Sequence, residues 1–309
     1  MNFLAIVLAL LLEQIRPPGA QNPVVDRLRA CARPIIAASD AGATQHGWLA
    51  WSLAALLPAV LAAAVHLLAL DIGGWPLALL WSVVVFYFTL GFCQFSQHFT
   101  QIREALEAGE DEQTRQLLAQ WPGAQASRPG QSEALRQAIE DSVLAAHRQV
   151  FGVLACASVF AVLGLGPAGA VLYRAAWFAR CGWPSRREPQ DTPASQALTD
   201  AARAAWRMID WLPARMTALV FAVVGNFEDA IDCWKNFPAR FPGDPGPSVL
   251  LAATAGALGV RLGAGAPPQG MPGHEPRLAH LPRVAALIWR AVVLWLFLLV
   301  LLTLAHVLG

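Results

Sequence analysis

"WLAWSLAALLPAVLAAAVHLLALDIGGWPLALLWSVVVFYFTLGFCQF" runs from Trp48 to Phe95 and decides the class of the fold. Neither Trp48–Leu70 nor Trp75–Phe95 contains an Asp, Glu, Lys or Arg residue. Each run is long enough to cross a hydrocarbon core of about 30 Å as a helix. Only "DIGG" separates the two runs, which predicts a tight transmembrane hairpin. A further uncharged run, Ala291–Gly309, predicts a C-terminal transmembrane helix.

The composition of the whole chain indicates the same class. Of the 309 residues, 56% are hydrophobic and 14% are charged, whereas a soluble domain has about 25% charged residues. The five cysteines form no CxxC pair, so the sequence indicates neither a zinc site nor a disulfide framework. We therefore predict an all-α polytopic integral membrane protein with about three full transmembrane helices, and we expect no nucleic-acid partner.

Two apolar segments carry helix-breaking residues. In Val150–Tyr173, Pro167 lies in a glycine-rich stretch, which leaves two alternatives open: one kinked span, or two half-helices. In "IDWLPARMTALVFAVVGNFED" (Ile209–Asp229), Pro213 and Arg215 interrupt the apolar run after one turn. This pattern predicts a broken or re-entrant segment whose irregular backbone lines a cavity. The alternative is a kinked span from which an arginine reaches the interface.

The distribution of arginines predicts the orientation in the membrane. The basic loops can all be cytoplasmic if the broken segments re-enter the membrane. We therefore predict a multi-pass protein of the bacterial inner membrane whose C-terminus lies in the periplasm. We expect helices over 102–121 and 132–150 outside the membrane. One domain, 1–309, is then organised as an N-terminal interfacial segment (1–46), the hairpin (48–95), a cytoplasmic helical insertion (96–149), broken membrane segments (150–233), a Gly/Pro-rich loop (234–283) and the C-terminal helix (291–309).

Five motifs resemble, in collinear order, those of the CobD/CbiB family of cobalamin-biosynthesis membrane proteins. They are "LLLEQIRPPGAQNPV" (10–24), "ALEAGEDEQTRQLLA" (105–119), "GPAGAVLYRA" (166–175), "WLPARMTAL" (211–219) and "ATAGALGVRLGAGA" (253–266). The resemblance implies an inner-membrane amide synthase. Such a synthase joins aminopropanol, or its phosphate, to a propionate of adenosylcobyric acid while consuming ATP. It also implies a corrinoid intermediate and other cobalamin-assembly membrane proteins as partners.

The chain also departs from that family pattern. After Tyr173, Arg174 and Ala175 it reads "AWFARCGW", where the family has an "NTLDSMVGYK" element. Glu140 stands for the first glutamate of the family's "ETVAENLSDG", and Asp210 is a remnant of its "ARLDDVAN". These departures resemble the AmpE-like branch, which implies a non-enzymatic regulatory protein linked to β-lactamase induction. Both functions stay open, and ATP with Mg²⁺ is expected only if the synthase activity is retained.

Charged and polar residues in or beside apolar segments are the candidates for ligand binding. An arginine there can bind a carboxylate or phosphate bidentately, but arginines at a membrane edge can equally anchor a helix, and acidic residues can cap one. No catalytic residue and no metal ligand is identified. The candidate substrate-binding residues are Glu140, Tyr173, Arg174, Asp210, Arg215, Asn226, Asp229 and Arg261.

Overall fold

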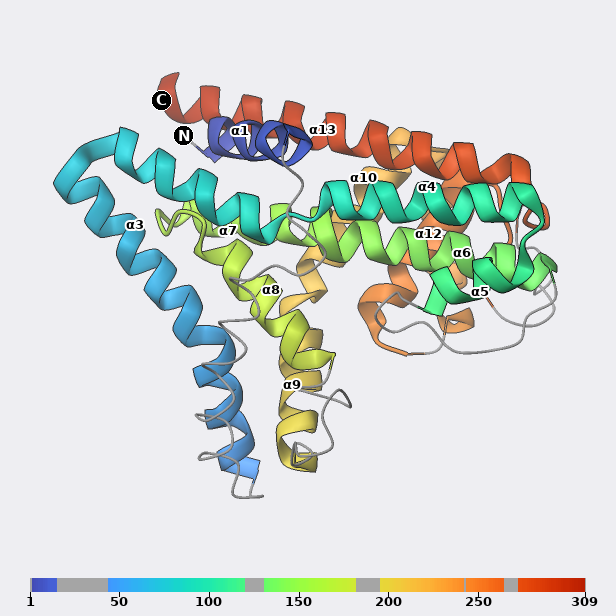
Figure 1. The fold of residues 1–309 in the computed structure, drawn as a ribbon, viewed down its shortest axis with the longest axis horizontal. Helices are drawn as coiled ribbons and strands as arrows, with labels where there is room; N and C mark the ends of the chain where they lie inside the picture. The colour runs from blue at the N-terminus through green and yellow to red at the C-terminus, as the bar shows by residue number, and fades with distance from the viewer. Residues whose placement is uncertain are drawn as a thin grey trace. The chain divides into compact units, whose positions relative to one another are not determined.

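The computed structural model describes residues 2–15, 44–119, 131–181, 195–241, 243–263 and 272–308 (Figure 1). The described chain is nearly all helical, and its only β-type pairing is an isolated bridge between Val260 and His274. Within these ranges, three helices are long and apolar enough to cross a membrane: Gln45–Thr89, Glu133–Val162 and Leu278–Ala305. These features confirm the predicted all-α fold and are consistent with a polytopic membrane protein.

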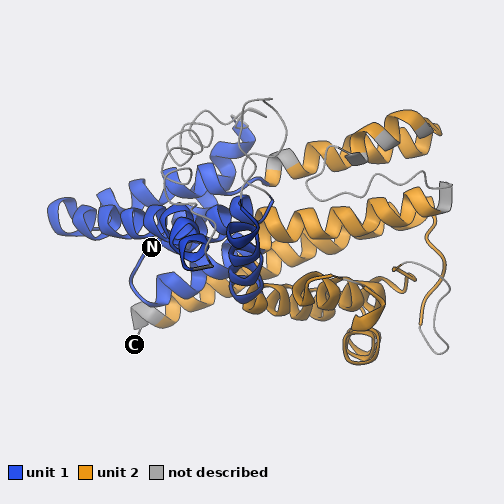
Figure 2. Cartoon of the chain, turned by 90° about the horizontal axis from the view of Figure 1, so that it is seen from below, with its two compact units in different colours: residues 1–91, 152–210 blue, residues 92–151, 211–309 orange. Residues whose placement is uncertain are grey.

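The chain divides into two compact units, each built from two separate segments (Figure 2). Unit 1 contains residues 1–91 and 152–210, and unit 2 contains residues 92–151 and 211–309. Asp210 is the last residue of unit 1, so the predicted region of broken membrane segments, 150–233, contributes to both units.

Unit 1 is organised around the long helix α3 (Thr44–Thr89), which kinks at Gly74 within the predicted "DIGG" turn. The chain reverses at this kink (Figure 1). The indole Nε1 of Trp81 in the second leg donates a hydrogen bond of 3.1 Å to the carbonyl of Ala62 in the first leg. The second leg ends at Thr89 rather than at Phe95, because a break separates it from the next helix.

The remaining helices of unit 1 are short. They are α1 (Asn2–Ile15), α7 (Gly152–Val162), α8 (Ala168–Arg180) and α9 (Gln196–Ile209). Helices α1, α8 and α9 pack on α3, and α7 packs on α8. The chain breaks between α7 and α8 in the stretch around Pro167. Residues 150–173 therefore contain two helices, and whether they cross the membrane or re-enter stays a prediction.

Unit 2 contains the C-terminal helix α13 (Leu281–Leu308), which begins before the predicted start at Ala291. Its other elements are α4 (Phe92–Ala108), α5 (Asp111–Ala119), α6 (Gln131–Ala146), a π-helical turn η1 (His147–Phe151), α10 (Trp211–Val224), α11 (Phe227–Asn236), η2 (Pro238–Arg240), α12 (Pro245–Leu258) and η3 (Leu278–His280).

Two expectations for unit 2 were wrong. The helix predicted over 102–121 breaks at Gly109, whose φ of 74° lies outside the helical region. Pro213 and Arg215 do not interrupt α10, because Pro213 occupies its first turn, where the backbone N–H has no partner within the helix. The breaks fall instead at Asp210 and at Gly225–Asn226. The cavity predicted along this segment stays a prediction.

The turn η1 is tied to α10 by a buried hydrogen bond. The hydroxyl of Thr217 donates to the carbonyl of Pro213 at 2.9 Å, and its oxygen lies 3.0 Å from Nδ1 of His147. Because that hydroxyl proton is engaged, Nδ1 of His147 is the donor. Single π-turns inside helices occur frequently at functional sites, and this one follows the helix that carries Glu140.

Candidate functional site

The segment "ATAGALGVRLGAGA" forms the end of α12 and a fixed turn after it. Gly259 caps the helix in the left-handed conformation, with φ 65° and ψ 37°. The N–H of Arg261 donates to the carbonyl of His274 at 2.8 Å, and the N–H of His274 donates to the carbonyl of Gly259 at 2.9 Å. These paired hydrogen bonds hold the backbone of Arg261 in place on both sides.

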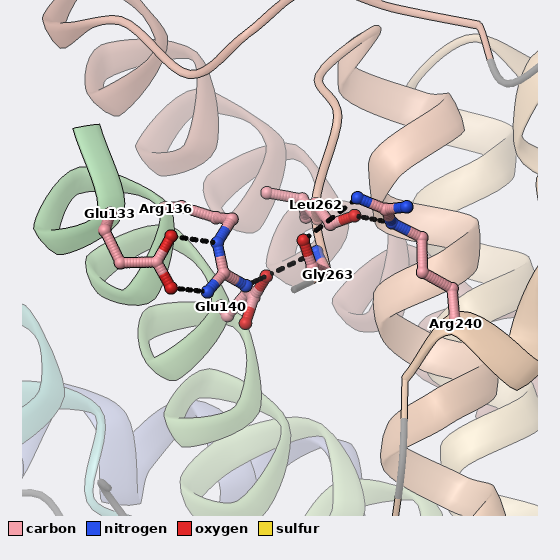
Figure 3. Close-up of polar contacts among 6 residues, drawn as sticks. All are labelled: Glu133, Arg136, Glu140, Arg240, Leu262 and Gly263. Carbon is pink, nitrogen blue, oxygen red and sulfur yellow. Dashed lines mark hydrogen bonds and ion pairs between the residues drawn. The ribbon is translucent and has the colours of Figure 1, made fainter. Parts of the chain in front are cut away.

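An arginine cluster surrounds this turn within unit 2; we define it as Arg136, Arg240 and Arg261 with Glu133 and Glu140. Arg136 lies between the two glutamates on α6 and bonds both of them, with 2.7 Å from its Nη1 to Oε1 of Glu140 (Figure 3). The same Oε1 accepts the N–H of Gly263 at 2.6 Å. Glu140 thereby joins α6 to the turn after α12, although the residues are far apart in the sequence.

Arg240 reaches the same turn from η2. Its Nε donates to the carbonyl of Leu262 at 2.6 Å, and its Nη2 donates to the carbonyl of Gly263 at 3.1 Å (Figure 3). Burial lowers the pKa of the Arg240 guanidinium below its usual value, and the positive charges of Arg136 and Arg261 lower it further, whereas Glu140 opposes the shift. The three guanidinium groups are therefore close enough for their charges to interact.

Arg261 differs from its neighbours because its side chain has no partner among the residues that the structure describes. Its guanidinium makes no hydrogen bond or ion pair within the described part of the chain, and its Nε is buried without a partner. A partly buried cation without a partner is unfavourable unless an anion compensates it. The geometry of the arginine cluster therefore suits the binding of an anionic group.

A second polar group lies in unit 1 and is buried; we call Glu13, Tyr173, Arg174 and Asp210 the buried polar cluster. The hydroxyl of Tyr173 donates to Oδ1 of Asp210 at 2.8 Å. Nε of Arg174 donates to the carbonyl of Thr89 at 2.5 Å, and its charge interacts with Glu13. Tyr173, Asp210 and Glu13 are 0%, 2% and 1% exposed. These contacts join α1, α3, α8 and the end of α9 inside the apolar unit.

The described side chains do not fit a resident metal site. No group of three or more His, Cys, Asp or Glu side chains is positioned to hold a metal ion within the described residues. The two carboxylates of the arginine cluster both bond Arg136.

Comparison with known proteins identifies the family. The sequence model described as "CobD/Cbib protein" matches residues 3–295. The chain belongs to the CobD/Cbib family. This confirms the resemblance inferred from the five motifs.

The cobalamin biosynthesis protein CobD of Stutzerimonas stutzeri (strain A1501) is 29% identical to this CobD/Cbib protein over 326 residues, covering 96% of this chain and 97% of that protein. The CobD of Chromobacterium violaceum is 32% identical over 188 residues, covering 60% of this chain and 55% of its own length. The CobD of Mycobacterium tuberculosis is 30% identical over 206 residues, with 61% and 58% covered. No solved structure matches significantly. These relatives support a function in cobalamin biosynthesis, whereas the AmpE-like branch stays a prediction.

Of the candidate residues in this CobD/Cbib protein, five fall into the two clusters. Glu140 and Arg261 lie in the arginine cluster, and Tyr173, Arg174 and Asp210 lie in the buried polar cluster. The sequence interpretation missed Glu13, Glu133, Arg136 and Arg240 as site residues. The signal for Arg136 was its spacing of three from Glu133 and four from Glu140 on one helix, which brings such side chains together.

Among the described residues, the side chains of the other three candidates bond only groups of their own segments. Arg215 donates from Nη1 to the carbonyl of Trp211 at 2.9 Å, and its guanidinium lies 4.2 Å from the centre of the Trp211 ring. Asn226 caps α11, with its Oδ1 accepting the N–H of Asp229 at 3.3 Å. These contacts match the anchoring and capping alternatives, and ligand binding by the three residues stays a prediction.

Proposed function

We propose that this protein is a multi-pass enzyme of the bacterial inner membrane that amidates a propionate of adenosylcobyric acid with aminopropanol or its phosphate. The amide bond forms between the propionate carboxyl and the amine with loss of water, and ATP with Mg²⁺ is a co-substrate that drives the step. The observation that carries the proposal is the unpaired Arg261 on the family's own "AGALGVRLG" turn, beside Arg240. The CobD relatives support the pathway.

The arginine cluster supplies what the anionic substrates of this reaction require. Arg240 and Arg261 provide positive charge in unit 2, and arginine is the residue best suited to bind carboxylate and phosphate groups. Glu140 is a positioning residue in this proposal, because it bonds Arg136 and the N–H of Gly263 rather than a ligand. Other membrane proteins of cobalamin assembly are predicted partners.

Genetic complementation tests the proposed function. A bacterial strain that lacks its cobinamide-phosphate synthase and is supplied with cobyric acid is expected to regain cobalamin-dependent growth when it expresses this chain. Arg261→Gln is expected to abolish that growth because it removes the unpaired cation. Arg290→Gln, at an exposed position on α13, is the matched control and is expected to keep it. Absence of growth from well-expressed wild-type protein would contradict the proposal and favour the regulatory alternative.

The orientation in the membrane can be measured separately. We expect a C-terminal alkaline phosphatase fusion, which is active only in the periplasm, to be active after α13. A C-terminal fluorescent protein that matures only in the cytoplasm is expected to remain dark. The reverse pattern would contradict both the periplasmic C-terminus and the assignment of the basic loops to the cytoplasm.

A further inference from the structure

We infer that Arg277 and Arg283, at the start of α13, form a binding site for the headgroup of an anionic phospholipid. The inference is independent of the proposed amide synthesis. It requires only that α13 crosses the membrane, which its length and composition allow. The two arginines are not members of the arginine cluster.

Helix α13 is longer than the hydrocarbon core of a bilayer. Its 28 residues, Leu281–Leu308, extend about 42 Å at about 1.5 Å per residue, whereas the core is about 30 Å thick. No Asp, Glu, Lys or Arg follows Arg290 in the sequence, so the stretch 291–308 fills about 27 Å of the core. Residues 281–290 and the turn η3 before them therefore lie at the level of the lipid headgroups.

His280 brings the two arginines of the site together. Its Nδ1 accepts the backbone N–H of Arg277 at 2.9 Å, and the charges of Arg277 and Arg283 both act on its buried imidazole ring. Neither guanidinium group donates a hydrogen bond to, or forms an ion pair with, a residue that the structure describes. Both arginines are exposed, so two cations beside one ring keep their donor groups available to a ligand.

This end of α13 has an excess of positive charge. Residues 275–309 contain three arginines and one acidic residue, Glu275, which is exposed and forms no ion pair with a described residue. The third arginine, Arg290, donates from Nε to the carbonyl of Ala286 at 3.2 Å and is thereby bonded to its own helix. Arg277 and Arg283 therefore supply the unbonded charge. Each basic side chain near an anionic lipid surface strengthens the attraction about fivefold.

The apolar neighbours of the two arginines indicate that the anion belongs to a lipid. Leu278 directly follows Arg277 and is 42% exposed, and Trp289 is 48% exposed. The ring of Trp289 packs on that of Phe92, with the ring centres 4.9 Å apart. Tryptophan is enriched where the headgroups meet the hydrocarbon core. A lipid covers an exposed leucine beside a guanidinium group, whereas a soluble phosphate leaves it in water.

The site is tested by native mass spectrometry of the full-length protein in a neutral detergent, titrated with phosphatidylglycerol or with zwitterionic phosphatidylcholine. Wild-type protein is expected to bind phosphatidylglycerol more tightly. The double variant Arg277→Gln/Arg283→Gln is expected to weaken that binding about tenfold or more and to leave phosphatidylcholine binding unchanged. Arg203→Gln, whose charge already faces Asp200 at 3.6 Å, is the matched control and is expected to bind like wild type.

Glycerol phosphate distinguishes a lipid headgroup from a soluble phosphate, because it carries a phosphate without acyl chains. It is expected not to displace phosphatidylglycerol, and displacement would assign the site to a soluble ligand and overturn the lipid. Equal binding of the two lipids by wild-type protein, or unchanged phosphatidylglycerol binding by the double variant, would also overturn the inference. Size-exclusion profiles verify folding. The single variant Arg283→Gln, expected to weaken binding about fivefold, decides the test if the double variant does not fold.

Discussion

Replacing Arg174 with glutamine is expected to destabilise the protein by about 1.5–3 kcal/mol, the cost of losing a charged hydrogen-bond donor from a buried acceptor. The substitution removes the charge that faces Glu13, which is only 1% exposed, and the donor that bonds the carbonyl of Thr89. The carbonyl of Thr89 would then lose this charged donor, and Glu13 would lose an attractive charge. Thermal unfolding in detergent, followed by retention of the monodisperse size-exclusion peak, measures the loss.

A double-mutant cycle isolates the contribution of the pair. Combining Glu13→Gln with Arg174→Gln is expected to cost less than the sum of the two single changes, because the attraction between the two charges is lost in each single variant and can be lost only once. Arg203→Gln is the matched control in the same unit. Its partner Asp200 lies 3.6 Å away and both side chains are more than half exposed, so a loss below about 1 kcal/mol is expected. Additive costs at positions 13 and 174 would contradict the pairing.

Gly256→Ala is expected to destabilise unit 2 by about 1–3 kcal/mol, the usual cost of forcing an extra methyl group into a packed contact. Gly256 lies in α12 against α11, and a Cβ atom built there would be 2.1 Å from the carbonyl oxygen of Asp229 and 2.5 Å from the amide nitrogen of Ala230. Backbone atoms cannot rotate away, so the two helices would have to separate.

The direction in which Gly256→Ala changes the unfolding temperature distinguishes a packed position from an open one. At an open helical position the same change would stabilise the protein by about 1 kcal/mol, because alanine favours the helix more than glycine does. A rise in the unfolding temperature of Gly256→Ala would therefore contradict the close approach of α11 and α12. Gly256→Ser, with one more heavy atom, is expected to be less stable than the alanine variant.

The all-α class and the apolar segments could be predicted from the sequence. The length of an apolar run and its lack of charged residues can be seen in the run itself, without knowledge of tertiary contacts. The details that failed depend on single backbone positions. Gly109 stands between Ala108 and Glu110, which are both compatible with a helix, and its positive φ reveals the break. Pro213 was expected to interrupt a helix, but α10 begins only two residues before it. The break that precedes α10 falls at Asp210, and neither a glycine nor a proline marks that position in the sequence.

The candidate site was only partly predictable, because its members come from three separate stretches of the chain. Arg261 was found through the motif that contains it. Arg240 lies in a Pro-rich stretch and Arg136 on an amphipathic helix, where arginines are usually solvated. Their convergence depends on tertiary contacts such as the bond between Glu140 and the N–H of Gly263, which spans 123 positions of the sequence.

The interleaving of the two units has a consequence for synthesis of the chain. Unit 1 has all its residues once Asp210 has left the ribosome, whereas unit 2 then has only residues 92–151. The contacts of this first part with α10, α12 and α13, including the bond between Glu140 and the N–H of Gly263, can form only after those later helices have been made. Chains released early are therefore complete in one unit and exposed in the other, which makes them natural targets for membrane proteases and chaperones.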